Sequence, residues 1–149
     1  MRLGAIRASA HDRRECDPVR TVATHEELEF ECDLGLRDTR CDVAADVIER
    51  AGTHMLRTAF VTLEGWINSL PPSLVRTRPG LISLRGPILA MKGNLEESND
   101  LLNLAVSIYR KDLDNAGLAL ALTRRAHTLR LLGEYHASIN DIEEALRLA

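Results

Sequence analysis

An internal repeat with an offset of 40 residues is the feature that most constrains how this chain can fold. It is anchored by Gly93 and Gly133, and a weaker copy places Thr39 at the same position. Small residues coincide with small ones, and large apolar residues with large ones, at the other matched positions: Gly86 and Ala126, Leu89 and Leu129, Ser98 and Ser138, Leu102 and Ile142, and Ala105 and Ala145. Arg85 falls on Arg125. A unit that buries only one face requires a stacked neighbour, so the pattern predicts a repeat architecture.

Apolar residues recur with helical spacing before a double-proline break. Helical patterning begins near Glu26 and becomes clear after Asp42, a residue type that caps helix N-termini. The helix behind this cap has four apolar residues on one face: Val43, Val47, Ile48 and Ala51. In a second helix, apolar residues step by four and three positions: Leu56, Phe60, Leu63, Ile67 and Leu70. Proline has no backbone N–H, so Pro71 and Pro72 are expected to end this helix.

The repeated region is helical in its pattern throughout. A helix over 81–92 is expected to bend at Pro87 and to end at Gly93, and another covers 95–110. After a charged break at 111–115, two apolar stripes lie on either side of the second repeat glycine: Leu118, Leu122, Ala126 and Leu129, then Tyr135, Ile139, Ile142 and Leu146. No segment alternates with the period of two of a half-buried strand. The sequence therefore predicts an all-α fold of antiparallel helix pairs.

One domain accounts for the patterned part of the chain. The 149 residues include 45% hydrophobic side chains, enough for a continuous core, so we expect a helical-repeat domain over 26–149. Residues 1–25 show no clean period and are expected to form an irregular N-terminal arm. The net charge of −3 gives no basic field for nucleic acid, and no apolar run is long enough for a membrane span. The start also lacks the apolar stretch of a secretory signal, which indicates a cytoplasmic chain.

The three cysteines do not indicate a metal site. Cys16, Cys32 and Cys41 lack the close CxxC spacing of structural zinc sites. His11 and His25 are the side chains that would complete such a site with them, but reduced and partly buried thiols are the favoured interpretation. The sequence therefore predicts no metal and no cofactor.

Catalytic groupings are equally thin. The acidic pairs at 96–97 and 143–144 occupy helical turns, where such side chains usually form a solvated face. Cys41 and His54 would supply a thiol and a base, but nothing in the sequence activates the thiol or orients the imidazole. We therefore expect a protein that binds a partner and is not an enzyme.

The last helix pair resembles the tetratricopeptide repeat. It carries residues in the order of that motif: Ala126, Leu129, Gly133, Tyr135, Ser138, Ala145 and Leu148. Arg125 departs from the pattern at a position that is usually apolar, and Arg85 repeats the departure one unit earlier. The resemblance implies helix pairs stacked as a right-handed superhelix, an α-solenoid with a concave binding groove.

Residues 38–149 also resemble the helical-repeat region of MalT-like regulators, which are large ATP-binding transcription factors of the LuxR type. The resemblance is most specific in LPPSLVRTRPGL at 70–81, followed by GNLEE at 93–97. In that family the repeats form a sensor between a nucleotide-binding module and a helix-turn-helix, and they take up a small inducer or a regulatory protein. The chain contains neither a phosphate-binding loop motif nor a recognisable recognition-helix module, so ATP hydrolysis and DNA binding are not carried over.

Two non-catalytic functions are consistent with these patterns. The first is the sensor module of a MalT-like transcriptional regulator, which binds a small-molecule inducer or a protein in its concave groove. The alternative is a free-standing tetratricopeptide scaffold or adaptor that mediates protein–protein interaction.

Three polar residues are the candidate ligand contacts. The tetratricopeptide resemblance places Thr123, His127 and Arg130 on the concave face, bordered by Leu120 and Leu131. Their spacing of four and three makes one strip, in which Arg130 would offer planar donors to a carboxylate or a sugar hydroxyl. The competing interpretation is an ordinary solvated helix face, with the arginine paired to a nearby acid.

Two further patterns concern partners. Arg124 and Arg125 form a basic pair, but no aromatic residues interleave with them, so we expect no direct nucleic-acid binding. Solenoids normally end in a polar capping helix, whereas the last helix of this sequence has an apolar stripe. An exposed stripe of this kind predicts a homodimer through the following residues: Tyr135, Ile139, Ile142 and Leu146.

Overall fold

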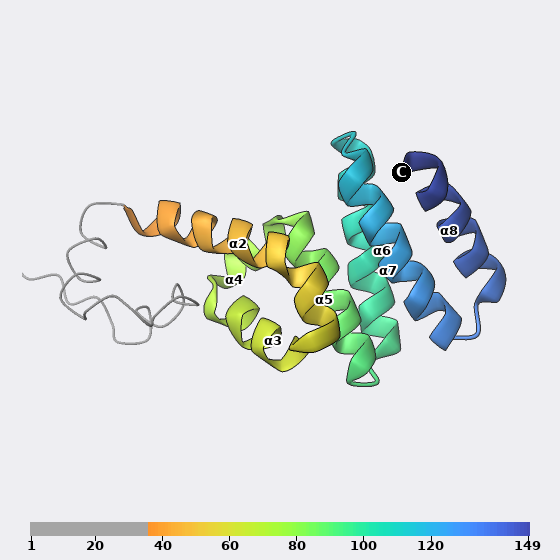
Figure 1. Cartoon of the computed structure of the whole chain (residues 1–149), viewed down its shortest axis with the longest axis horizontal. Helices are drawn as coiled ribbons and strands as arrows, with labels where there is room; N and C mark the ends of the chain where they lie inside the picture. The colour runs from red at the N-terminus through yellow and green to blue at the C-terminus, as the bar shows by residue number, and fades with distance from the viewer. Residues whose placement is uncertain (1–35) are drawn as a thin grey trace, which may run out of the picture.

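The computed structural model describes residues 36–149, and every regular element in that part of the chain is an α-helix (Figure 1). The helices are α2 (Leu36–Thr58), α3 (Phe60–Ser69), α4 (Pro72–Thr77), α5 (Pro79–Met91), α6 (Leu95–Lys111), α7 (Asn115–Leu131) and α8 (Tyr135–Leu148). The all-α prediction is therefore confirmed for this range. Some expectations fall outside the described residues: the arm at 1–25, the start of the repeat domain at 26, and the roles considered for His11, Cys16, His25 and Cys32.

Helix α2 begins earlier than its sequence suggests. It runs without interruption through Thr39 and Asp42, so Asp42 does not cap a helix. The weak third copy of the repeat, which required a turn at Thr39, is wrong for the same reason. The Asp42 carboxylate instead lies 3.6 Å from the guanidinium of Arg78. In the same helix, Cys41 is buried and disulfide-bonded, which corrects the expectation of a reduced thiol.

Ala59 and two prolines set the next helix boundaries. Ala59, with a φ of −153° and a ψ of 49°, separates α2 from α3, so the apolar stripe expected over 56–70 is shared between two helices. Helix α3 ends at Ser69, as the double proline predicts, but Pro72 also begins the short helix α4, which the sequence did not predict. Pro79 begins α5 in the same way, because a proline in the first helical turn lacks only an N–H that has no helical partner.

The repeated helix pairs, α5 with α6 and α7 with α8, share one turn geometry. Gly93 and Gly133 have positive φ values of 89° and 85°, a conformation that residues with a side chain rarely adopt. In each turn the backbone N–H of the next residue closes a hydrogen bond of 2.9 Å: Asn94 donates to Leu89 O, and Glu134 donates to Leu129 O. The offset of 40 residues is thus confirmed in the backbone.

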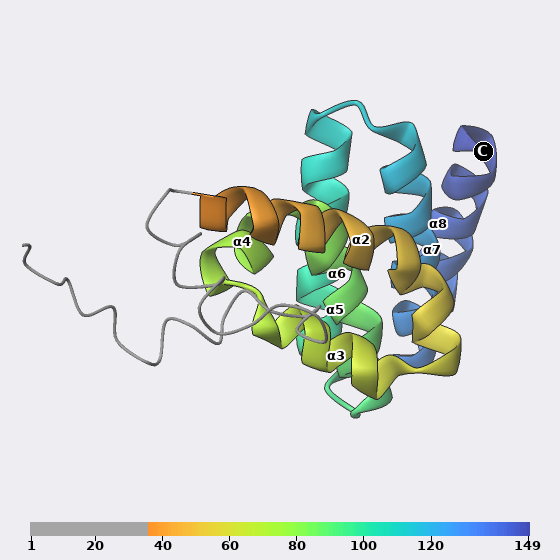
Figure 2. The same cartoon turned by 60° about the vertical axis from the view of Figure 1, so that its left-hand side comes forward.

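Two hydrophobic clusters hold the helices together, and α5 belongs to both. The first lies between α2, α3, α4 and α5 and includes Ile48 and Leu81. The second joins α5 to α6, α7 and α8 and includes Ile82 and Leu122. Because Leu81 and Ile82 are neighbours in sequence but belong to different clusters, α5 is buried on two sides. It accordingly lies in the middle of the molecule, where it accommodates Pro87 without interruption of the helix (Figure 2).

The C-terminal helices follow one another in space as they do in sequence. Helix α6 packs on α5, α7 packs on α6, and α8 packs on α7, while α2 and α3 lie against α5 (Figures 1 and 2). Within the described range, no helix is both long and apolar enough to cross a membrane.

Candidate functional site

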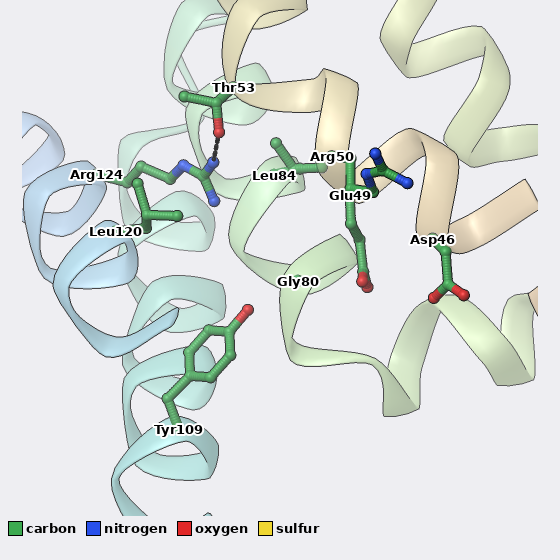
Figure 3. A pocket seen from close by; sticks show the side chains of 9 residues that line it. All are labelled: Asp46, Glu49, Arg50, Thr53, Gly80, Leu84, Tyr109, Leu120 and Arg124. Atoms are coloured by element: carbon green, nitrogen blue, oxygen red, sulfur yellow. Dashed lines mark hydrogen bonds between the residues drawn. The ribbon is translucent and has the colours of Figure 1, made fainter. Parts of the chain in front are cut away.

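A cleft of about 380 Å³ opens between α2, α5, α6 and α7 (Figure 3). Residues four positions apart share a helix face, so α2 and α7 each bring a pair of side chains to it. All four helices contribute to its lining: Glu49 and Thr53 from α2, Leu84 from α5, Tyr109 from α6, and Leu120 and Arg124 from α7. The cleft therefore joins helices of the N-terminal cluster to helices of the C-terminal pairs.

Arg124 reaches from α7 toward α2 and is partly buried (Figure 3). Its Nη1 donates to Ser83 Oγ at 2.7 Å, and its Nη2 donates to Thr53 Oγ1 at 2.8 Å. Both acceptors are uncharged, and no carboxylate within residues 36–149 forms an ion pair with this guanidinium. Burial lowers the pKa of Arg124 from its ordinary value, and the Tyr109 phenol opposes this shift only in part. The cleft thus holds a partly desolvated cation that has no carboxylate partner in the part of the chain that the structure describes.

The carboxylates at the rim of the cleft are bound to a different cation. Arg78, just before α5, donates to both carboxylate oxygens of Glu49 at 3.1 Å and also forms an ion pair with Asp46. Although burial alone lowers it, these hydrogen bonds and charges raise the pKa of Arg78. Arg50 also lines the rim, is exposed, and has no ion-pair partner in the described range. Among the described residues, the cations of the cleft without a carboxylate partner are therefore Arg124 and Arg50.

Tyr109 forms the wall contributed by α6. Its ring packs on the first turn of α7 at Gly117, where a Cβ atom would lie only 2.2 Å from the ring atom Cε1. The hydroxyl group points into the cleft and makes no hydrogen bond with the part of the chain that the structure describes (Figure 3). Burial and then the charge of Glu49 raise the pKa of the phenol to about 12. Tyr109 therefore stays protonated at neutral pH and can donate a hydrogen bond.

The strip predicted from the sequence lies on the exposed side of α7, beside the cleft. His127 Nδ1 and Arg130 Nη2 are 3.2 Å apart, so the structure brings these two side chains together. Thr123 instead donates to the backbone oxygen of Ala119 at 2.8 Å. Within residues 36–149, Arg130 forms no ion pair with an acid, whereas the competing interpretation required one. Neither Thr123, His127 nor Arg130 lines the cleft, and their role in binding stays a prediction.

The sequence did not single out Arg124 as a residue of the cleft. It grouped this residue with Arg125, whereas in the structure the two arginines face different partners. Arg125 binds the buried Asp141 carboxylate through hydrogen bonds of 2.7 and 2.6 Å. The repeat nevertheless marks Arg124 as unusual, because the equivalent position in the preceding helix pair is Leu84, which is 1% exposed. A charged side chain where the matching position is buried indicates a specific local environment.

The apolar stripe of α8 is exposed, as the dimer prediction requires. Its four residues retain much of their solvent-accessible surface: Tyr135 63%, Ile139 54%, Ile142 39% and Leu146 72%. The spacing of four, three and four residues puts these side chains on one face of the helix. Self-association through this face stays a prediction.

Other chemistry considered for the sequence finds no support around the cleft. Cys41 is disulfide-bonded, so it does not supply the thiol considered with His54. In residues 36–149 no three His, Cys, Asp or Glu side chains are grouped so as to hold a metal ion. No protein-family model, curated protein or solved structure matches the chain.

Proposed function

We propose that this protein is a non-catalytic helical-repeat module that binds a ligand reversibly in the cleft around Arg124. The observation that carries the proposal is a partly buried guanidinium at the edge of a cavity of about 380 Å³, whose hydrogen bonds within residues 36–149 all go to two hydroxyl groups. Ligand pockets typically combine apolar walls with a few polar groups that converge on one place. Leu84 and Leu120 supply such walls here, and Arg124 and Tyr109 supply the polar groups.

The position of the cleft suits a sensor. Arg124 of α7 is tied to Thr53 of α2, 71 positions away in the sequence. A ligand in this place would contact both the N-terminal cluster and the last helix pair, so its binding would favour one relative position of the two. This is the behaviour expected of the sensor module of a MalT-like regulator. Further antiparallel pairs stacked on α7 and α8 would extend the arrangement into a right-handed superhelix.

Several features support binding without catalysis. The Tyr109 phenol is protonated at neutral pH, and the carboxylates of Asp46 and Glu49 are bound to Arg78. The phenol therefore supplies no base at neutral pH, and a guanidinium already occupies both carboxylates. The cleft offers hydrogen-bond donors and a positive charge, which serve recognition.

Two other surfaces support protein partners. His127 and Arg130 lie together on the exposed side of α7, where a protein segment would find a donor group next to the cleft. This observation favours the alternative function of a scaffold or adaptor. The exposed stripe of α8 favours a homodimer, because contiguous apolar patches promote association.

A fragment screen monitored by protein NMR tests the proposed function without any assumption about the ligand. Small molecules of mixed charge are added to the isotope-labelled chain, and backbone amide shifts are followed. Hits are expected to cluster on amides at Thr53, Gly80 and Tyr109, with the fragments recovered chemically unchanged. Hits that map only to the exposed strip of α7 or to α8 would contradict the proposal, as would conversion of a fragment that persists after repurification.

A further inference from the structure

We infer that the cleft is built for the carboxylate of a small organic acid, which Arg124 and the hydroxyl of Tyr109 bind together. This inference rests on the proposed function and narrows it to one class of ligand. Both donors lie at one cavity, Asp46 and Glu49 form ion pairs at its rim, and leucine side chains line its walls. Each of these features excludes a different class of competing ligand.

The donors of the cleft are only partly used by the protein. A guanidinium has five N–H donors, and Arg124 spends two of them on Ser83 and Thr53. The remaining donors lie in a plane that matches the two oxygens of a carboxylate. The Tyr109 hydroxyl has no hydrogen-bond partner in the described range and points into the same space (Figure 3). A neutral ligand such as an amide would leave the positive charge of Arg124 unmatched.

The charges around the cleft favour a single negative charge on the ligand. Arg124 has no carboxylate partner among the described residues. A partly buried cation gains more from an arriving anion than an exposed one does. Arg50 adds a second positive charge at the rim. The carboxylates of Asp46 and Glu49 lie on the same rim, in ion pairs with Arg78. They would repel a phosphate dianion more strongly than a carboxylate.

The apolar walls of the cleft indicate that the ligand has an apolar group attached to its carboxylate. Leu84 and Leu120 line the cleft, and Leu120 is 46% exposed, so it has apolar surface left to cover. A volume of about 380 Å³ lies near the lower end of the range for small-molecule pockets. A ligand of the size of benzoate or a short-chain fatty acid fits these limits. Inorganic anions would leave the apolar walls in water.

Benzoate, benzamide and inorganic phosphate are suitable probes, because benzamide matches benzoate in shape without its charge. Each is titrated into the full chain at low ionic strength, and amide shifts at Thr53, Gly80 and Tyr109 give the dissociation constant. Benzoate is expected to bind at least about tenfold more tightly than benzamide or phosphate. Arg124→Met should abolish the preference for benzoate, and Tyr109→Phe should weaken benzoate several-fold. Arg57→Met, which changes an exposed arginine of α2 outside the cleft, should leave it unchanged.

The outcomes separate this inference from the proposed function. Equal binding of benzoate and benzamide at the cleft amides would overturn the carboxylate inference, while the cleft would remain a binding site. Tighter binding of phosphate would overturn it in the same way. Failure of all three probes, while neutral fragments bind at the cleft, would also overturn it. The comparison of benzoate with benzamide uses the unaltered chain, so a variant that fails to fold does not weaken the test.

Discussion

The two helix pairs α5–α6 and α7–α8 have the same backbone plan but different surroundings. Their turns match at Gly93 and Gly133, in φ and in the hydrogen bond that follows. Leu102 of the first pair is fully buried, with 0% exposure, whereas the matching Ile142 of the second pair is 39% exposed. Helix α7 covers α6, and no helix of the described range covers the equivalent face of α8. The repeat therefore fixes the conformation, and the neighbouring helices decide how much each position contributes to stability.

The chemistry of the second pair also differs from that of the first. On α7, Arg124 replaces Leu84, and the fully buried Thr128 replaces Ile88. The Thr128 hydroxyl lies 3.0 Å from the hydroxyl of Ser98 on α6, so this polar group is satisfied inside the core. The polar exchanges on α7 face α2, α5 and α6, which is where the cleft opens. The positions that are apolar on α5 and polar on α7 thus lie on the side of α7 that borders the cleft and α6.

Truncation at matched core positions is the strongest test of the comparison. Leu102→Ala should lower the free energy of unfolding by about 3–4 kcal/mol, because it leaves a cavity in a fully buried place. Ile142→Ala should cost only about 1 kcal/mol, because part of that side chain already contacts water. Urea denaturation of both variants measures the difference. Equal losses would show that α8 is covered to the same extent as α6.

The ion pair of the second helix pair gives the next largest effect. Asp141 is buried and binds Arg125, while the matching position in the first pair is Leu101. Asp141→Leu should therefore cost about 2–3 kcal/mol, because it leaves the partly buried arginine without its carboxylate. The double variant Arg125→Met with Asp141→Leu should recover most of that loss. A double variant as unstable as the single one would show that shape, and not charge, explains the cost.

The turn glycines test what the two pairs have in common. Gly93→Ala and Gly133→Ala should each cost about 1 kcal/mol, because both residues have positive φ while no atom lies within 4 Å of an added Cβ. The effect should be equal in the two pairs, in contrast to the core truncations. Gly65→Ala is a matched control in α3, where a Cβ also meets nothing and an alanine favours the helix. Unequal losses in urea denaturation would indicate that the two turns are not equivalent.

The helices of the repeat could be predicted because their signals are local. Glycine after a helix and spaced apolar residues before it depend on a few neighbouring positions, and α6 begins at Leu95 as expected. The start of α2 could not be predicted from Asp42, because a capping residue type also occurs within helices when its side chain has another partner. Here that partner is Arg78, 36 positions later in the sequence. The short helix α4 was missed because a double proline ends one helix but can also begin the next.

The candidate site was harder to predict than the fold. The sequence predicted a binding strip on α7 at Thr123, His127 and Arg130, which stays a prediction, whereas the cleft opens beside another face of the same helix. The environment of Arg124 depends on Thr53 and Ser83, which come from two helices far away in sequence. The packing of the helices brings these hydroxyls to the guanidinium, which has no carboxylate partner within residues 36–149. The substitution of Leu84 by Arg124 in the repeat is the one local sign of this arrangement.

The face of α8 that lacks a neighbour provides the last test, with the smallest expected change in stability. Ile139→Glu with Leu146→Glu should alter the free energy of unfolding of the monomer by at most about 0.5 kcal/mol per site, because both side chains are more than half exposed. The same change should abolish self-association, because each carboxylate would be buried in a dimer without a partner. Light scattering is expected to give the mass of a dimer for the unaltered chain and of a monomer for the variant. Leu113→Glu, at an 84% exposed leucine outside α8, should leave the dimer intact. An unaltered chain that stays monomeric at high concentration would show that this face of α8 does not drive association.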